Sequence, residues 1–264
     1  MSDAPEATPS ILVENVWVQF LIRYHRSEVT LRESFVRILE GLSRNGKREN
    51  SWRQQFWALR GVSLAAKPGD VVGLIGRNGS GKTTLLKTLA GIVTADRGRV
   101  QLKGTLGCLL SFGVGFRTNL SGRENVFING SLLGLTEEAI AERLGQIIEF
   151  SELGDFIDAP VRTYSTGMRG RLGFAIAINI DPDVLVLDEV LTAGDMAFQK
   201  KAGSVLERFR GHRKIVVVAS HNMEFIRTTC TQALWLDHGE VRAAGNPETV
   251  TAAYAEFSSA IASP

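Results

Sequence analysis

The eight residues GRNGSGKT, Gly76 to Thr83, restrict the possible folds of this chain more than any other stretch. They fit the pattern G-x-x-x-x-G-K-[ST] and stand between the apolar run VVGLIG (71–76) and the helix-forming run TTLLKTLAGI. In this setting the glycines let the backbone wrap around phosphate groups, and consecutive N–H groups point at the anion from a helix N-terminus. We therefore expect a buried strand, a phosphate-binding loop and a helix, in that order.

The loop also predicts its ligands, a triphosphate and Mg²⁺. Lys82 is expected to bring a positive charge to the β- and γ-phosphates, and the Thr83 hydroxyl to ligate Mg²⁺. A surface turn can carry such a pattern by chance, but the flanking strand and helix favour the binding function. The residues expected to bind nucleotide here are Gly76, Asn78, Gly79, Ser80, Gly81, Lys82, Thr83 and Thr84.

A second apolar run, VLVLDE (184–189), ends in two acids. Ligands of open α/β sheets collect at the carboxyl ends of the strands, where these acids would lie. Asp188 is expected to hold Mg²⁺ through water, and Glu189 to orient or deprotonate the attacking water. Such an acidic pair is often only a loop cap, but its combination with the phosphate loop favours catalysis.

The order of the remaining segments predicts an α/β fold with a largely parallel sheet. Helices are expected near 198–210 and from Met223, a mainly helical tract from Leu120 to Ile180, and a final hairpin in ALWLDHGEVRAAG. With 264 residues the chain is long enough for one domain, expected at 11–257 after a flexible tail at 1–10.

Composition excludes several classes of protein. The 44% hydrophobic and 22% charged residues are typical of a soluble globular domain, and a net charge of +2 gives no reason to expect nucleic acid as a partner. The first residues, MSDAPEATPS, form no apolar leader, and no apolar run is long enough to span a bilayer. Cys108 and Cys230 are expected to be free thiols, and the four histidines form no metal-ligand pattern.

The stretch YSTGMRGRLGF, Tyr164 to Phe174, reads as the start of an amphipathic helix. Met168, Leu172 and Ile176 recur at helical spacing, and Ser165 is placed as an N-cap. A helix N-terminus that carries a glycine and partial positive charge favours a phosphate group. This stretch is therefore a second candidate half of the site.

Together these ordered motifs resemble the ATPase subunits of ATP-binding-cassette (ABC) transporters over about residues 11–255. The resemblance implies a P-loop NTPase core, an antiparallel β-subdomain and an inserted helical subdomain at about 116–180. It also implies a head-to-tail homodimer, in which a short segment of one subunit closes over ATP held by the phosphate loop of the other. The matching residues of that segment are Tyr164, Ser165, Thr166, Gly167 and Met168.

The same resemblance assigns two further roles. His221, in ASH after a strand, matches the family's switch histidine and would contact the γ-phosphate, whereas a lone histidine there would be an ordinary surface residue. Asp195, in TAGD, matches a loop that crosses the dimer interface. An aromatic near the start of the domain stacks on adenine in this family; the candidates are Phe20, Tyr24 and Trp57, of which Trp57 is preferred, with core packing as the alternative.

Two stretches depart from the common family pattern. Thr166 and Met168 replace a glycine and a glutamine, and LLSFGVGF (109–116) lacks a glutamine that senses Mg²⁺ and the membrane subunit. Gly113 and Gly115 in that place fit either flexible coupling or a simple turn.

The departures are similar to one branch, the ATPases that export bacterial polysaccharide, O-antigen, capsule and wall teichoic acid. That branch implies two ATPase subunits with two polytopic membrane subunits at the cytoplasmic face of the inner membrane, and a lipid-linked glycopolymer as cargo. No C-terminal carbohydrate-binding domain is expected in this chain. The alternatives are another transporter type for drugs or solutes, a soluble ABC protein acting on ribosomes or DNA, and a nucleotide-binding regulator without turnover.

Residues 21–57 are predicted to be an inserted basic amphipathic segment. Thr30 and Glu33 fit a capping box, and Leu31, Phe35 and Ile38 lie on one helical face. Eight basic residues against four acidic ones give the segment a charge of +4. It suits the membrane surface or a partner helix, and equally a helix packed on its own domain.

Overall fold

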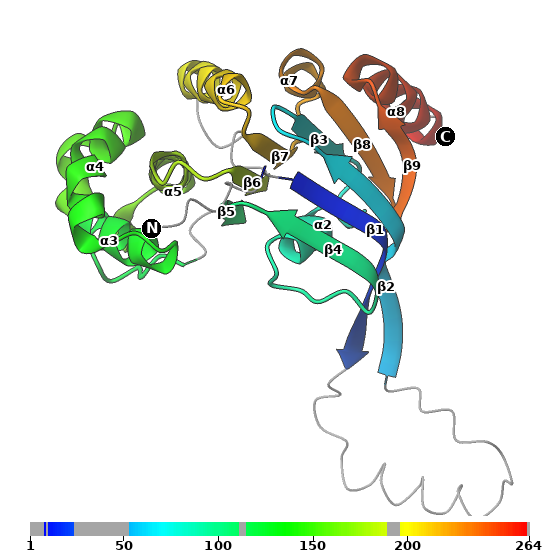
Figure 1. Ribbon diagram of the computed structural model, residues 1–264, viewed down its shortest axis with the longest axis horizontal. Helices are drawn as coiled ribbons and strands as arrows, with labels where there is room; N and C mark the ends of the chain where they lie inside the picture. Colours follow the sequence, from blue (N-terminus) through cyan, green and yellow to red (C-terminus); the bar gives the residue numbers. More distant parts are fainter. Residues whose placement is uncertain (1–7, 9, 24–52, 111–114, 189–195, 263–264) are drawn as a thin grey trace, which may run out of the picture.

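The computed structural model describes residues 8, 10–23, 53–110, 115–188 and 196–262 (Figure 1). In this part of the chain, strands form a three-stranded sheet ordered β2-β1-β4 and a six-stranded sheet ordered β5-β6-β7-β3-β8-β9. The strands are β1 (Ser10–Arg23), β2 (Arg53–Ala66), β3 (Val71–Ile75), β4 (Arg97–Lys103), β5 (Leu106–Leu110), β6 (Val184–Asp188), β7 (Ile215–Ala219), β8 (Gln232–Asp237) and β9 (Glu240–Gly245).

Neighbouring strands of the six-stranded sheet are parallel from β5 to β8, and β9 alone pairs antiparallel, with β8. Strands β3, β6 and β7 are apolar and buried along their whole length. Strands of a parallel sheet are buried along their whole length because other elements cover both faces of the sheet. In β6, Val184 and Val186 face one hydrophobic cluster, while Leu185 and Leu187 face the other.

Different helices cover the two faces of the six-stranded sheet (Figure 1). The first cluster buries α2 (Lys82–Leu89) between the two sheets, through Leu85, Leu86 and Leu89. The second buries α6 (Met196–Gly211), α7 (Met223–Thr229) and α8 (Pro247–Ala262), along with the C-terminal half of α5 (Thr166–Asn179), on the opposite face. The phosphate-loop helix is thus fixed from both sides.

A third hydrophobic cluster lies among the helices between β5 and β6. It is built from α3 (Gly122–Leu132), α4 (Glu137–Ser151), one face of α5 and two 3₁₀ turns, η1 (Gly154–Asp158) and η2 (Val161–Thr163). Val126, Ile140, Ile147 and Leu172 are fully or nearly fully buried in it. This cluster gives the helical tract a core of its own.

The structure corrects several expected boundaries. Strands β1 and β2 pair in register as far as Arg23 opposite Arg53, so residues 21–23 and 53–57 belong to a long hairpin rather than to an insertion (Figure 1). Thr30, Glu33 and the rest of 24–52, like the tail at 1–7, lie outside the described residues. Strands β4 and β5 were not expected, and α8 continues past residue 257 to Ala262.

The predicted α/β fold with a mainly parallel sheet is confirmed, as are the strand–loop–helix order around Gly76 and the final hairpin. Among the described helices, none is both long and apolar enough to pass through a bilayer.

Candidate nucleotide site

Strand register brings the predicted motifs to one edge of the six-stranded sheet. Asp188 of β6 pairs with Ala219 of β7, and Ala219 pairs in turn with Leu74 of β3. The phosphate loop begins two residues after Leu74, and His221 stands two residues after Ala219. Because these strands are parallel, their carboxyl ends deliver the loop, the acid and the histidine to the same edge.

Close packing explains why the loop needs glycine at its two ends. Gly76 has a φ of 147°, and a Cβ there would stand 2.2 Å from the carbonyl oxygen of Leu236. Gly81 has a φ of 110°, and its Cβ would meet the carbonyl oxygen of Ala58 at 2.7 Å. Glycine alone tolerates such approaches together with a left-handed backbone. The loop is therefore held between β2 on one side and β8 on the other.

Lys82 lies folded across the loop that it follows. It is 5% exposed, and its Nζ donates to the carbonyl oxygens of Gly76 at 2.8 Å and Arg77 at 3.1 Å. Lys82 is also the first residue of α2, and Thr83 and Thr84, both half-buried, follow it in the first turn. The ammonium group is thus placed inside the ring of loop backbone, where a phosphate-binding lysine is required.

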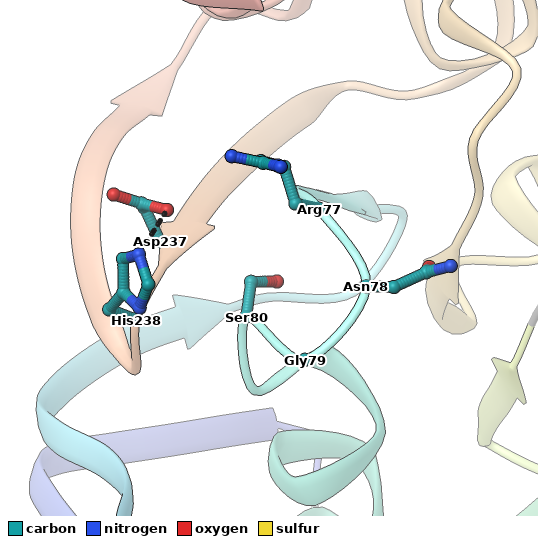
Figure 2. A pocket seen from close by; sticks show the side chains of 6 residues that line it. All are labelled: Arg77, Asn78, Gly79, Ser80, Asp237 and His238. Carbon is teal, nitrogen blue, oxygen red and sulfur yellow. Dashed lines mark ion pairs between the residues drawn. The ribbon is translucent and has the colours of Figure 1, made fainter. Parts of the chain in front are cut away.

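The turn between β8 and β9 supports the loop from outside. The Gly239 N–H donates to the carbonyl of Ser80 at 2.9 Å, and the Gly239 carbonyl accepts from the Arg60 N–H of β2 at 2.8 Å. A cavity of about 200 Å³ lies between loop and turn, lined by Arg77, Asn78, Gly79, Ser80, Asp237 and His238 (Figure 2).

Two groups in this cavity have unusual surroundings. The Ser80 Oγ is buried and has no hydrogen-bond partner among the described residues. Asp237 is 5% exposed, and its carboxylate lies 3.4 Å from an Arg242 nitrogen and 3.8 Å from His238 Nε2. Figure 2 shows Arg77 extending toward the side of Asp237, while Asn78 points the other way.

The sequence had not indicated Arg77, Asp237 or His238 as part of the site. A signal was present in the run LDHGE, an acid and a turn glycine at the end of a strand. It becomes meaningful only once β8 is known to pair with β3.

His221 is exposed at the end of β7. Its neighbour Ser220 is buried, donates its N–H to the Leu74 carbonyl at 3.2 Å and accepts from the Asn222 N–H at 3.1 Å. Asn222 then caps α7 by accepting from Phe225 N at 3.0 Å. The histidine is therefore presented between a strand bonded to β3 and a capped helix.

Ser165 is the N-cap of α5, as predicted, because its side chain accepts from the Met168 N–H at 3.1 Å. Ser165 is exposed, and Gly167 and Met168 are half-buried. Tyr164 and Met168 pack with the third hydrophobic cluster, whereas the helix of the phosphate loop packs in the first. The fold therefore places the two candidate halves on different structural units.

The three aromatic candidates for adenine stacking differ in their surroundings. The ring of Trp57 contacts Trp17 edge-on at 5.4 Å between centroids, and the Arg97 guanidinium lies 5.4 Å above it. Phe20 is 42% exposed, opposite Phe56 across the β1–β2 pair. Tyr24 lies outside the described residues.

Glu189 and Asp195 also lie outside the described residues, as do 111–114, which include Gly113. Gly115 is described and has a φ of 99°, which fits the turn interpretation for that residue. In the described ranges no three His, Cys, Asp or Glu side chains gather as a metal site. Thr83 is half-buried in the first turn of α2, and Asp188 is 5% exposed at the carboxyl end of β6.

A glycine-bounded loop between a buried strand and a helix, facing an acidic strand end in a mainly parallel sheet, defines a P-loop nucleotide-binding domain. A finer assignment comes from comparison with known families, in which residues 59–192 match the family described as ABC transporter. The chain belongs to the ABC transporter family.

Curated relatives include proteins named for O-antigen export and for teichoic acid export. The O-antigen export system ATP-binding protein of Myxococcus xanthus is 44% identical over 252 residues, 96% of this chain and 57% of that protein. The teichoic acids export ATP-binding protein of Lactococcus lactis is 42% identical over 77% of this chain and 44% of its own length. An O-antigen export ATP-binding protein of Klebsiella pneumoniae is 39% identical over 76% of this chain and 82% of its own. The chain thus spans about half the length of the first two.

Solved structures share the fold at low sequence identity. A dimeric ATP-binding cassette bound to ADP and phosphate superposes with a TM-score of 0.69 at 20% identity, covering 90% of this chain and 98% of that one. The ATP-binding subunit of an ABC transporter superposes with a TM-score of 0.70 at 16% identity, covering 93% of each chain. These likenesses confirm the P-loop ATPase fold.

Proposed function

We propose that this chain is the ATPase subunit of an ABC exporter of a lipid-linked cell-surface polysaccharide or teichoic acid. The observation that carries the proposal is the strand register that brings the phosphate loop, Asp188 and His221 to one sheet edge, with Ser165 presented by a separate helical unit. The curated relatives support the export branch, since they are named for O-antigen and teichoic acid export.

The residues at this edge of the six-stranded sheet have different roles in phosphoryl transfer. Bound Mg²⁺ supplies positive charge to the triphosphate, and Thr83 and Asp188 are the residues that would hold it. The loop N–H groups and Lys82 bind and orient the phosphates. Glu189 takes a proton from the attacking water, and His221 donates a hydrogen bond at the terminal phosphate.

A second copy of the chain completes the site. Ser165 and Gly167 stand at the N-terminus of α5, where backbone N–H groups and the helix dipole favour a phosphate group. Because α5 packs with the helical unit rather than beside α2, a head-to-tail pair is the arrangement that sets Ser165 against a partner's phosphate loop. Asp195 would lie at the same interface.

For adenine we now favour Phe20 over Trp57. The Trp57 ring is already in contact with Trp17 and Arg97, while Phe20 and its pair Phe56 expose nearly half of their surface. The carbonyl of Ala58, two residues after Phe56, abuts the phosphate loop at Gly81. A base stacked on Phe20 therefore lies within one or two residue lengths of the loop.

The α3 groove is a surface suited to the membrane subunit. It is an open hollow of about 520 Å³ lined by Phe127, Ile128, Ser131, Leu132 and Glu137. Leu132 is 74% exposed at the end of α3. An apolar side chain left this open beside a hollow is typical of a protein contact surface. We assign a cytoplasmic helix of the membrane subunit to this groove, in a complex of two ATPase and two membrane subunits at the inner face of the membrane.

A matched pair of variants tests the assignment. Leu132→Glu places a charge in the groove, and Ile92→Glu places the same charge on another exposed apolar residue, 62% exposed just after α2 and not part of the groove lining. Co-purification with a co-expressed candidate membrane subunit should fall at least tenfold for Leu132→Glu and stay unchanged for Ile92→Glu. Both variants should hydrolyse ATP alone as the unaltered chain does. Equal co-purification of the two variants would reject the groove as the docking surface.

A further inference from the structure

The side chain that precedes Ser165 is unusually well fixed. Tyr164 is 3% exposed in the third hydrophobic cluster, and its hydroxyl donates to the Phe156 carbonyl of η1 at 2.5 Å. The same hydroxyl approaches the first residue of α3, since a Cβ at Gly122 would stand only 2.3 Å from it. Burial raises the pKa of Tyr164, so the hydroxyl stays protonated and able to donate. One oxygen thus joins η1, α3 and the entry to α5.

Backbone hydrogen bonds join the same segments. The Val161 N–H donates to the Leu120 carbonyl at 2.9 Å, and the Arg162 N–H donates to the Thr118 carbonyl at 2.8 Å. In the other direction, the Gly122 N–H donates to the Ala159 carbonyl at 3.3 Å, and Ser121 forms a β-bridge with Pro160. The segment that leads into Ser165 (159–162) is therefore hydrogen-bonded to the segment that leads into α3 (118–122).

Asn125 makes the α3 side of this pairing rigid. It is fully buried; its side-chain oxygen accepts from the Arg117 N–H at 2.7 Å, and its amide donates to the carbonyls of Arg117 at 3.0 Å and Ser121 at 2.8 Å. Ser121 and Glu124 add a complete capping box at the same helix start. α3 and the Ser165 segment can then move as one body, while the α3 groove lies along the same helix from Phe127 onward.

We propose that Tyr164 is a positioning residue for the partner's nucleotide: its hydroxyl holds Ser165 and the N-terminus of α5 in the arrangement needed to close on a second copy. This role rests on the proposed function. The resemblance placed Tyr164 in the segment that closes over the partner's ATP; within that segment the Tyr164 side chain is buried in the helical core, whereas Ser165 is exposed. Tyr164 therefore acts through Ser165 and touches no phosphate itself.

The substitution that isolates this role is Tyr164→Phe, which keeps the ring in the core and removes one oxygen. Its matched control is Ser151→Ala, which removes a hydroxyl that is likewise buried in the helical unit and donates to the Ile148 carbonyl at 2.9 Å. Each variant loses a single neutral hydrogen bond, which lowers stability by a modest amount. Both variants should therefore melt a few degrees lower than the unaltered chain, by similar amounts.

The experiment measures dimerisation by sedimentation in a Glu189→Gln background, which binds ATP without turning it over. Adding Tyr164→Phe should leave the affinity of the monomer for ATP within twofold and weaken ATP-driven dimerisation about three- to tenfold. Adding Ser151→Ala should weaken it less than twofold. A readout of dimerisation separates positioning from plain stability, since both variants lose stability alike.

Either of two results overturns the role of Tyr164: dimerisation of Tyr164→Phe equal to that of its Glu189→Gln parent, or an equal weakening by Ser151→Ala. If the Glu189→Gln parent binds ATP but stays monomeric, the proposed function itself fails, and the role of Tyr164 falls with it.

Discussion

Close atomic contacts fix the packing of β3, the strand that leads into the phosphate loop. A Cβ at Gly73 would stand 2.7 Å from Ile226 Cδ1 and 2.9 Å from Cys230 Sγ, so α7 and the cysteine after it pack directly on this strand. Cys230 is buried, and burial raises the pKa of its thiol to about 12. The strand that leads into the phosphate loop therefore packs against a buried, protonated thiol on its α7 face.

This thiol predicts a stability loss in alkali. Its pKa is 9.0 when exposed and about 12 in the folded chain, so its contribution is complete below pH 9 and is lost as the pH rises toward 12. The free energy of unfolding should fall by up to about 1.4 kcal/mol per pH unit in that window from this group. Urea unfolding at pH 8, 9, 10 and 11 measures it.

Other groups also titrate in this window, and Cys230→Ala isolates the thiol. The variant should be less stable at pH 8 because of the lost packing, and its stability should then decline less steeply than that of the unaltered chain. Parallel slopes for the two proteins would contradict the buried, protonated state of Cys230.

Elements that are specified by neighbouring residues were the ones predictable from sequence. The phosphate loop and the Ser165 cap depend on residues within one turn of each other, and both form as expected. Strand β4 was missed because it is mostly exposed and lies beside β1 at a sheet edge, so no continuous apolar run marks it. α8 was missed because its apolar face depends on packing against Trp235 of β8 through Tyr254 and Phe257.

The start of α3 should be the least tolerant point of the helical unit. Replacing Asn125 with alanine leaves the Arg117 N–H without its side-chain acceptor. It also removes the amide bonds to the carbonyls of Arg117 and Ser121, which keep only their bonds from the backbone N–H groups of Leu120 and of residue 125. An unsatisfied buried group costs about 1–3 kcal/mol, so we expect a loss of about 2–3 kcal/mol in the free energy of unfolding.

Asn179→Ala is the matched control for Asn125→Ala. Asn179 is half-buried, and its amide donates to the Ala175 carbonyl of its own helix at 2.7 Å. We expect its loss to cost about 1 kcal/mol or less, because that carbonyl already belongs to the α5 backbone. Chemical denaturation compares the two variants, and equal losses would show that the Asn125 network does not fix the segment.

At the scale of the whole molecule, the site depends on contacts that join distant parts of the chain. The order of motifs predicted that the loop, Asp188 and His221 would share a sheet edge, because parallel strands present their carboxyl ends together. Pairing of β8 with β3, and hence the place of Asp237 and His238 beside Ser80, could not be deduced, since no local pattern states which strands are neighbours. The separation of Ser165 from α2, by packing in different hydrophobic clusters, was implied by the family resemblance and not by any local pattern.

The central claim is that one ATP site is built from two copies of this chain, and mixing two inactive variants tests it most directly. Lys82→Ala removes the phosphate charge, and Ser165→Arg blocks the face that closes on the partner. In a mixed pair, one site combines an unaltered loop with an unaltered Ser165 segment. We predict that each variant alone hydrolyses ATP at less than about 1% of the unaltered rate, since removing such preorganised groups costs 10²–10³-fold. The mixture should recover a substantial part of that rate. Full activity of Ser165→Arg alone, or a mixture as inactive as its parts, would contradict the shared site.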